Sequence, residues 1–394
     1  MQYEREISNK IKKISSEFSI VVLTGARQVG KTTLLKKLFS NYNYVSLDIP
    51  STAKFAEENP DLFLEKYPPP LIIDEVQYAP EIFRNLKVWI DKNRDLKGQL
   101  ILTGSQKFNL MKEVSDSLAG RVGLIELEPL SIFELSKKEK FSNQNLPEML
   151  ERGFYPELWK ERTRSSFQYY QSYLNTYLER DVRQIINITS LLDFEKFLRL
   201  LATRVGQTLD KSSLSKDVGV KVNTINSWLS VLEASNQIVF LQPYYENFGS
   251  RLIKSPKFFF SDVGFCVYLL GLSKASLLDS SVLGSLWENL VFAELRKRNL
   301  ANMHQGQFWF YRDSLAREVD LLYVNQGKVH FIETKWSARP EEKIGLLLER
   351  ISSQLKSRSV KKGTLTIISR VQDPYKVTGE ALATSIFDYN LPET

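Results

Sequence analysis

The first third of the chain alternates short, continuous apolar runs with longer amphipathic ones. The apolar runs have the length and composition of buried strands, and the segments between them carry apolar residues at helical spacing. Because strands that alternate with helices form parallel sheets, this part is predicted to be an α/β domain that ends near residue 135. The predicted strands are residues 19–24, 44–47, 71–73, 100–103 and 124–127, and the predicted helices are 31–39 and 81–93.

The remainder of the chain changes pattern twice. Residues 136–192 are expected to form a helical linker or lid, in which a run of tyrosines at helical spacing is interpreted as packing: Tyr169, Tyr170, Tyr173 and Tyr177. A small helical unit follows over residues 193–261, and a mixed α/β segment occupies 262–394. We therefore predict a multidomain α/β protein, which fits its length of 394 residues.

Composition excludes several kinds of site. The chain has one cysteine, Cys266, so an internal disulfide is excluded. With only two histidines, His304 and His330, it cannot form a zinc site built from cysteine and histidine. A bound metal is therefore expected to be magnesium-like and held by oxygen ligands.

Hydropathy and charge limit the cellular locations and the binding partners that we expect for this protein. No apolar run reaches the roughly 18–20 residues that a membrane span needs, and the N-terminus lacks the apolar core of a signal peptide. A cytoplasmic protein without a membrane partner is expected, and a single cysteine fits a reducing compartment. The net charge of +7 and the pI of 9.1 are compatible with a polyanionic partner such as DNA.

Residues 25–32 carry the strongest motif in the chain, a phosphate-binding P-loop between a predicted strand and a predicted helix. They match the pattern G-x-x-x-x-G-K-[ST]. Its glycines let backbone N–H groups surround a β-phosphate, and the helix that follows adds its positive end. Lys31 is expected to reach the β- and γ-phosphate oxygens, and the Thr32 hydroxyl to take a magnesium position. The residues predicted to bind nucleotide are Gly25, Ala26, Arg27, Gln28, Val29, Gly30, Lys31, Thr32 and Thr33.

Later strand ends are expected to complete an ATP-hydrolysing site that uses Mg²⁺. After one strand, Asp74 is predicted to hold the metal through water and Glu75 to polarise the attacking water. Thr103 or Ser105, at the end of another strand, could sense the γ-phosphate; the alternative is a strand-to-turn cap. Arg121 is a candidate arginine finger for a neighbouring subunit, or else an ordinary surface arginine.

Residues 214–229 are predicted to form a helix-turn-helix with its tight turn at Gly219. Segments 238–241 and 257–260 could add the two strands of a wing. The outward face of the second helix is polar, and its predicted DNA contacts are Lys221, Asn223, Thr224, Asn226 and Ser227. The alternative is a winged helix that is structural or contacts protein.

A β-hairpin is predicted around Gln326-Gly327, because two apolar strands flank this pair. With the pair at the tip, Asn325 opposes Lys328, and Asp320 then lies opposite Glu333. Directly opposed residues have side-chain roots about 5 Å apart. Two carboxylates at this spacing destabilise the hairpin unless a positive charge lies between them.

These carboxylates predict a metal site of the nuclease type. A divalent cation between Asp320 and Glu333 would have Lys335 beside it as a catalytic group rather than a ligand. Glu288 is assigned to the same site, because a carboxylate on the apolar face of a predicted helix needs a partner. The alternative is a hairpin in which Lys335 and Arg317 neutralise the acids without metal.

Together, the motifs resemble a prokaryotic family of AAA-type ATPases. Its members have an N-terminal P-loop domain, a winged helix and a C-terminal restriction-endonuclease-like α/β domain. The resemblance implies ATP binding and hydrolysis, and often a homo-oligomer such as a hexameric ring. The matching segments are residues 25–33, 71–77, 100–106, 117–121, 180–181, 261–264, 287–289, 317–320 and 333–335.

Three functions are compatible with these motifs. The leading one is an ATP-driven enzyme that binds and remodels or translocates DNA, including branched DNA. The second is a nucleotide-dependent signalling or defence switch that acts on a protein partner. The third is an ATP-gated, metal-dependent nuclease. DNA-stimulated ATP turnover would favour the first, indifference to DNA the second, and metal-dependent cutting the third.

Overall fold

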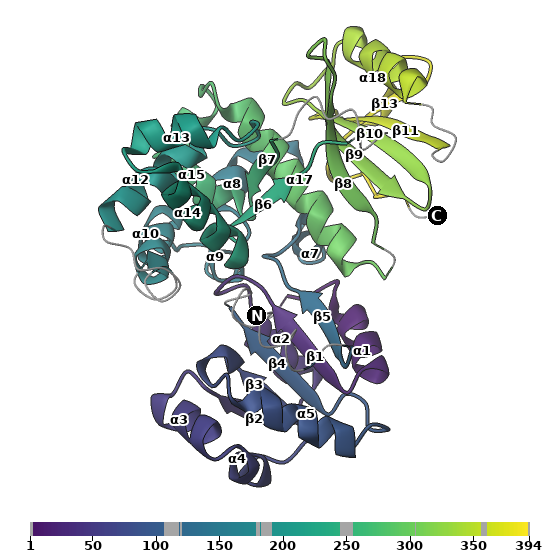
Figure 1. Cartoon of the computed structure of the whole chain (residues 1–394). Helices are drawn as coiled ribbons and strands as arrows, with labels where there is room; N and C mark the ends of the chain where they lie inside the picture. Colours follow the sequence, from purple (N-terminus) through teal and green to yellow (C-terminus); the bar gives the residue numbers. More distant parts are fainter. Residues whose placement is uncertain are drawn as a thin grey trace.

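The computed structural model has three lobes (Figure 1), which follow one another along the chain. The structure describes residues 3–105, 118, 120–178, 182, 191–244, 255–303, 305–355 and 361–392. Several residues of the motifs above lie outside the described part: Gln106, Ser117, Ala119, Arg180, Asp181 and His304.

The N-terminal lobe is built on a five-stranded parallel sheet in the order β2-β3-β4-β1-β5. The three strands at its centre are buried on both faces, as expected for a parallel sheet covered by helices. This confirms the α/β prediction for the first third of the chain. Its helices and strands are α1 (Ser8–Glu17), β1 (Ile20–Thr24), α2 (Lys31–Leu38), β2 (Asn43–Ser46), α3 (Pro50–Glu58), α4 (Pro60–Lys66), β3 (Leu71–Asp74), α5 (Ile82–Lys92), β4 (Leu100–Gly104) and β5 (Val122–Glu126).

The middle lobe is helical. Two of its helices, α13 and α14, are joined at Gly219, whose φ of +91° allows the tight turn, and β6 pairs antiparallel with β7. Two helices and a pair of strands lie where the helix-turn-helix and its wing were predicted, and the winged-helix assignment itself stays a prediction. The helices and strands are α7 (Ile132–Ser136), α8 (Leu146–Arg152), α9 (Pro156–Lys160), α10 (Ser166–Tyr177), α12 (Leu191–Ala202), α13 (Lys211–Val218), α14 (Val222–Ala234), β6 (Ile238–Leu241), β7 (Lys257–Phe260), α15 (Val263–Leu269) and α16 (Lys274–Leu277).

The C-terminal lobe is a mixed six-stranded sheet in the order β12-β13-β11-β10-β9-β8. Helix α18 packs against β10, β11 and β13, and the long helix α17 contacts β10 and extends toward the N-terminal lobe (Figure 1). Asn325 pairs with Lys328, which confirms the predicted hairpin register. The elements are α17 (Leu283–Ala301), β8 (Gln307–Arg312), β9 (Glu318–Asn325), β10 (Lys328–Thr334), α18 (Glu342–Gln354), β11 (Lys361–Ile368), β12 (Tyr375–Lys376) and β13 (Ala381–Thr384).

One hydrophobic cluster is shared by the lobes, and the N-terminal and C-terminal lobes each have a separate cluster of their own. A single cluster of buried apolar side chains runs from Ile7 to Leu391 and includes the tyrosines of α10, which are buried as predicted. Asp262 lies at a junction of this core, where its carboxylate accepts from the Phe154 N–H and from the Tyr170 hydroxyl, both at 2.6 Å. Since α15 packs on α8, α10 and α12, the division predicted between residues 261 and 262 falls within a packed helical unit.

Candidate nucleotide site

The loop between β1 and α2 has the backbone that a phosphate-binding loop needs. Gly25 has a φ of +146°, Gln28 of +62° and Gly30 of +95°, so the chain turns repeatedly through left-handed conformations. A Cβ atom at Gly25 would lie 2.1 Å from the Leu127 carbonyl oxygen, so only glycine fits there. Residues 25–32 thus form a compact loop that ends at the first turn of α2.

Lys31 and Thr32 begin helix α2, which places both at the mouth of the loop. The Lys31 ammonium is buried and donates to the carbonyl oxygens of Gly25 and Ala26 at 2.9 and 3.0 Å. The Thr32 hydroxyl donates to Asp74 Oδ2 at 2.7 Å. A hydroxyl next to a carboxylate is a donor set that fits Mg²⁺, which prefers oxygen ligands.

Asp74 accepts hydrogen bonds from several other residues of the site. It ends β3 and is buried, and its two oxygens accept from hydroxyls on three different strands or helices. Thr103 donates to Oδ1, and Thr32 and Tyr44 donate to Oδ2, Tyr44 at 2.8 Å. Burial and the Asp74 charge raise the pKa of Tyr44, so the phenol stays protonated and remains a donor. Tyr44 was not predicted for this site, although β2 pairs with β3 beside Asp74.

Glu75 follows directly and takes a left-handed backbone conformation with a φ of +55°. Such a conformation is costly for a side-chain residue and occurs mostly at functional sites. Ser105 donates to Glu75 Oε2 from its hydroxyl at 3.0 Å and from its N–H at 3.2 Å, and Gln77 donates to the same oxygen. Ser105 therefore orients the Glu75 carboxylate, and Thr103, which donates to Asp74, orients the neighbouring one.

A cavity of about 870 Å³ opens over this loop. Gly30, Lys31, Thr32 and Glu75 line one side, and helices α9 and α10 of the middle lobe line the other. An adjoining pocket of about 370 Å³ is lined by apolar groups of Tyr3, Val29, Leu34, Leu130 and Pro156 together with basic side chains. The site thus has a polar compartment at the P-loop and a more apolar one beside it.

Helix α10 also contacts the P-loop itself. The Tyr169 hydroxyl donates to the Gln28 side chain at 2.6 Å, and Arg164, just before the helix, lines the cavity. Arg164 is paired with Glu157 and Glu161. Tyr169 was predicted only to pack; its periodicity indicates a buried face and carries no signal for a polar contact 141 positions away.

The residues that were predicted to contact DNA, or to act on the site of a neighbouring subunit, lie away from this loop. Arg121 pairs with Asp91 of the same chain at 3.0 Å, and its role as an arginine finger stays a prediction. On α14, Lys221, Asn223 and Ser227 are exposed, Thr224 and Asn226 are partly exposed, and the apolar side faces the core. The outward polar face is therefore present, and its DNA contacts stay a prediction.

The carboxylates of the C-terminal lobe lie around a lysine that sequence analysis did not single out. Lys257 of β7 is buried, and its ammonium lies 2.8 Å from Glu288 and 2.5 Å from Glu318. Burial and the nearby Asp320 charge raise the pKa of Glu288 to about 8. Glu288, the carboxylate on the apolar face of its helix, is thus paired with the Lys257 ammonium from β7, a strand of the predicted wing.

Asp320 and Glu333 approach each other as the hairpin register requires. The Asp320 N–H donates to Glu333 at 3.3 Å, Thr334 donates to Asp320 at 2.8 Å, and Lys335 donates to Glu333 at 2.7 Å. Arg317, the other predicted neutralising cation, pairs with Asp313 instead. Within the described ranges, no three or more Asp, Glu, His or Cys side chains are arranged to hold a metal ion. The nuclease-type metal site stays a prediction.

Comparison with known families agrees with the geometry of the N-terminal lobe. Residues 17–136 match the model of a family described as an AAA domain. Residues 143–276 and 283–387 match two families that are each described as a domain of unknown function. The N-terminal lobe therefore has the fold of an AAA-type P-loop ATPase. Among the described residues, no helix is long and apolar enough to cross a membrane.

The chain is similar over most of its length to proteins that are described as uncharacterized. One from Mycobacterium tuberculosis is 26% identical over 338 residues, which are 85% of this chain and 74% of that protein. One from Methanocaldococcus jannaschii is 23% identical over 359 residues, 82% of this chain and 78% of that protein.

Two solved structures of ATPases are also similar in part. A Walker-type ATPase of Pyrococcus abyssi is 15% identical, with a TM-score of 0.46 over 68% of this chain and 96% of that one. The Thermotoga maritima RuvB Holliday junction branch migration motor is 15% identical, with a TM-score of 0.30 over 60% and 89% of the two chains. Likeness at this level assigns no function to this chain.

Proposed function

We propose that this protein binds ATP at residues 25–33 and hydrolyses it. The observation that carries the proposal is the cluster of Lys31, Thr32, Asp74 and Glu75: Lys31, Thr32 and Glu75 line one cavity, and Asp74 accepts from Thr32 beside it. Lys31 would exchange its loop carbonyl partners for β- and γ-phosphate oxygens, and Thr32 and Asp74 would hold Mg²⁺, which would supply positive charge against the β- and γ-phosphates.

Glu75 acts as the general base. The donors to Glu75 from the described residues Gln77 and Ser105 engage Oε2, and Oε1 is the oxygen that takes the proton from the attacking water. Ser105 keeps the carboxylate in this orientation, and Thr103 keeps Asp74 at the metal position. The base of the nucleotide occupies the adjoining 370 Å³ pocket between Tyr3 and Pro156, whose apolar surface suits a purine face.

Kinetics of two variants test the proposal. Lys31→Ala should abolish ATP binding, whereas Glu75→Gln should keep ATP affinity within about threefold and lower kcat by a factor on the order of 10²–10⁴. The matched control is Glu81→Gln, an exposed carboxylate paired with Arg84 on the surface. ATP turnover by Glu75→Gln at the wild-type rate would refute the role of Glu75.

A second proposal concerns the partner: DNA contacts the polar face of α14 and stimulates ATP turnover. The exposed Lys221, Asn223 and Ser227 on the second helix of the turn favour this, and the net charge of +7 attracts a polyanion. A homo-oligomer in which Arg121 serves a neighbouring site belongs to the same proposal.

The DNA proposal is tested by ATP turnover without DNA and with single strand, duplex or a four-way junction. Lys221→Glu should remove most of any stimulation, while Lys274→Glu, the same charge change on another exposed lysine, should not. Turnover and oligomeric state that are indifferent to every DNA would reject DNA as the partner and favour a protein-directed switch.

A further inference from the structure

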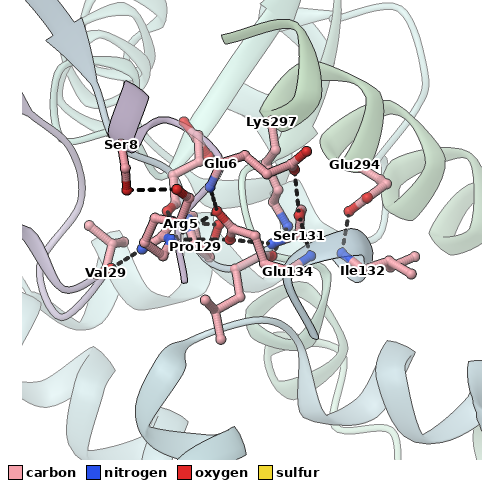
Figure 2. Close-up of polar contacts among 12 residues, drawn as sticks. Arg5, Glu6, Ser8, Val29, Pro129, Ser131, Ile132, Glu134, Glu294 and Lys297 are labelled. Carbon is pink, nitrogen blue, oxygen red and sulfur yellow. Dashed lines mark hydrogen bonds and ion pairs between the residues drawn. The ribbon is translucent and has the colours of Figure 1, made fainter. Parts of the chain in front are cut away.

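Arg5 contacts the phosphate-binding loop at Val29 (Figure 2) and is one of the basic side chains that line the 370 Å³ pocket. Its side chain is 8% exposed, and its guanidinium donates to the Val29 carbonyl at 2.9 Å, the Glu128 carbonyl at 2.6 Å and the Glu134 carboxylate at 3.0 Å. Moving such a buried cation would leave its partners unpaired, which is strongly unfavourable. Arg5 therefore ties one carbonyl of the P-loop firmly to the segment that follows β5.

The Val29 carbonyl matters because of the peptide to which it belongs. The Val29–Gly30 peptide is trans, so its N–H points opposite to its C=O. With the carbonyl held by Arg5, the Gly30 N–H is aimed away from Arg5, and Gly30 lines the nucleotide cavity. Backbone N–H groups of such a loop are the donors that bind phosphate.

Glu134 connects Arg5 to helix α7. It is 4% exposed and accepts from the N–H groups of Glu6 at 2.8 Å and Ser131 at 3.0 Å. Its own N–H donates to the Ser131 hydroxyl at 2.9 Å, which forms the capping box that starts α7. The position of Arg5 is thereby joined to the first turn of α7.

That first turn is held from the other side by α17. The Ile132 N–H donates to Glu294 at 2.8 Å, and Glu294 is 1% exposed and also accepts from Arg298 at 2.8 Å. Figure 2 shows the resulting row of contacts from Val29 to Glu294.

Two further side chains of α17 contact the same segment. Lys297 donates to the Leu130 carbonyl at 2.9 Å, and Arg296 pairs with both Glu126 and Glu128. Residues 126–134 are therefore clamped between Arg5 on one side and α17 on the other.

We propose that Arg5 is a positioning residue that aims the Val29–Gly30 peptide at the nucleotide phosphates, and that Glu294 makes this position depend on helix α17. The inference rests on the proposed ATP site and adds its regulation. Helix α17 packs on β7 of the middle lobe and β10 of the C-terminal lobe, so a partner that displaces either strand acts on ATP binding. By linkage, ATP acts back on α17 with the same coupling free energy.

The test measures equilibrium ATP affinity in the full chain carrying Glu75→Gln, so that turnover does not intervene. Glu294→Met should weaken ATP binding about tenfold, the range typical of coupled sites. Glu294→Gln keeps an oxygen that accepts from Ile132 and should restore at least half of the lost binding free energy. Arg5→Met should also weaken binding, and adding Glu294→Met to it should cost nothing more, because both act through one connection.

The matched control is Lys10→Met. Lys10 is also a buried cation that joins the N-terminal lobe to the end of α17, donating to the Leu300 and Asn302 carbonyls at 2.7 and 2.8 Å. Lys10 makes none of the contacts described above that connect Val29 to Glu294. The ATP affinity of Lys10→Met should therefore stay within about twofold of that of the Glu75→Gln chain. An effect of Lys10→Met equal to that of Glu294→Met would mean that general loosening, rather than this row, is responsible, and would overturn the inference.

Hydrogen exchange of the unmodified chain gives a second measurement that no misfolded variant can confound. ATP should slow amide exchange in residues 126–134 and in α17, and leave α18 unchanged. If bound ATP does not change amide exchange in α17, the inference is overturned while ATP binding itself is not. A chain that binds no ATP would overturn the proposed function as well, so the two failures are distinguishable.

Discussion

At the scale of single residues, the nucleotide site depends on backbone conformations that few side chains can take. Gly25 has a φ of +146° and lies against the Leu127 carbonyl, and Glu75 is held left-handed at the end of β3. The G-x-x-x-x-G-K-[ST] pattern predicted the glycines. The strain at Glu75 was not predictable, because it arises from the turn into the short helix Val76–Tyr78 and from Ser105 across the sheet.

Gly25→Ala should therefore lose ATP binding and destabilise the protein. The Cβ atom would meet the Leu127 oxygen at 2.1 Å, and the unfavourable φ alone costs about 1–3 kcal/mol. Thermal unfolding and ATP titration measure both effects. Gly284→Ala is the matched control: it lies in α17 with open space around it and should be neutral or slightly stabilising. Normal ATP binding by Gly25→Ala would contradict the geometry described for the loop.

At the scale of elements, the hairpin of β9 and β10 gives the clearest comparison of pattern and structure. The turn residues Gln326-Gly327 fixed the register, and Asn325 opposes Lys328 as predicted. Glu333 pairs with Lys335, the cation that the local sequence predicted. Glu318, at the start of the hairpin, pairs instead with Lys257 of β7, which lies more than 60 positions earlier in the chain and which no local pattern indicates.

His330 of β10 makes the C-terminal sheet sensitive to acid. Burial, and secondly the Lys328 charge, lower the pKa of His330, and its Nδ1 accepts from the Thr364 N–H at 3.1 Å only while unprotonated. The unfolded chain binds this proton near its ordinary pKa of 6.5, so stability is full above that pH and falls as the pH drops toward the folded pKa.

Urea unfolding at pH 7.5 and 5.5 measures this effect. His330→Gln should show a smaller loss of stability on acidification than the parent protein. Lys328→Gln, which removes one cause of the lowered pKa, should reduce the loss to a lesser extent. Equal losses in all three proteins would show that His330 does not contribute.

At the scale of the whole molecule, the lobes are joined by a shared core and by buried polar contacts. The cluster from Ile7 to Leu391 spans all three lobes, and α17 reaches back to residues 126–134. The boundaries predicted at residues 135 and 192 mark changes of pattern, and these changes do not tell which side chains pack across them.

Calorimetry of the full chain should accordingly give one cooperative unfolding transition rather than three. A nucleotide at 100 times its Kd should raise the temperature of the entire transition, by the equivalent of about 2.7 kcal/mol. Lys31→Ala, which cannot bind it, should show no shift. Separate transitions, of which only one responds to nucleotide, would contradict a shared core.

The sequence by itself determined the parallel α/β lobe, the phosphate-binding loop, the acidic strand end at Asp74 and Glu75, and the hairpin register. These features follow from local periodicity, glycine conformation and strand pairing. Only the tertiary structure decided that Tyr44 and Tyr169 reach the site, that Lys257 neutralises Glu288, and that Arg5 joins the P-loop to α17. Each of these joins residues that are far apart in sequence. Strand pairing within the N-terminal lobe brings Tyr44 to Asp74, and packing between lobes sets the other contacts.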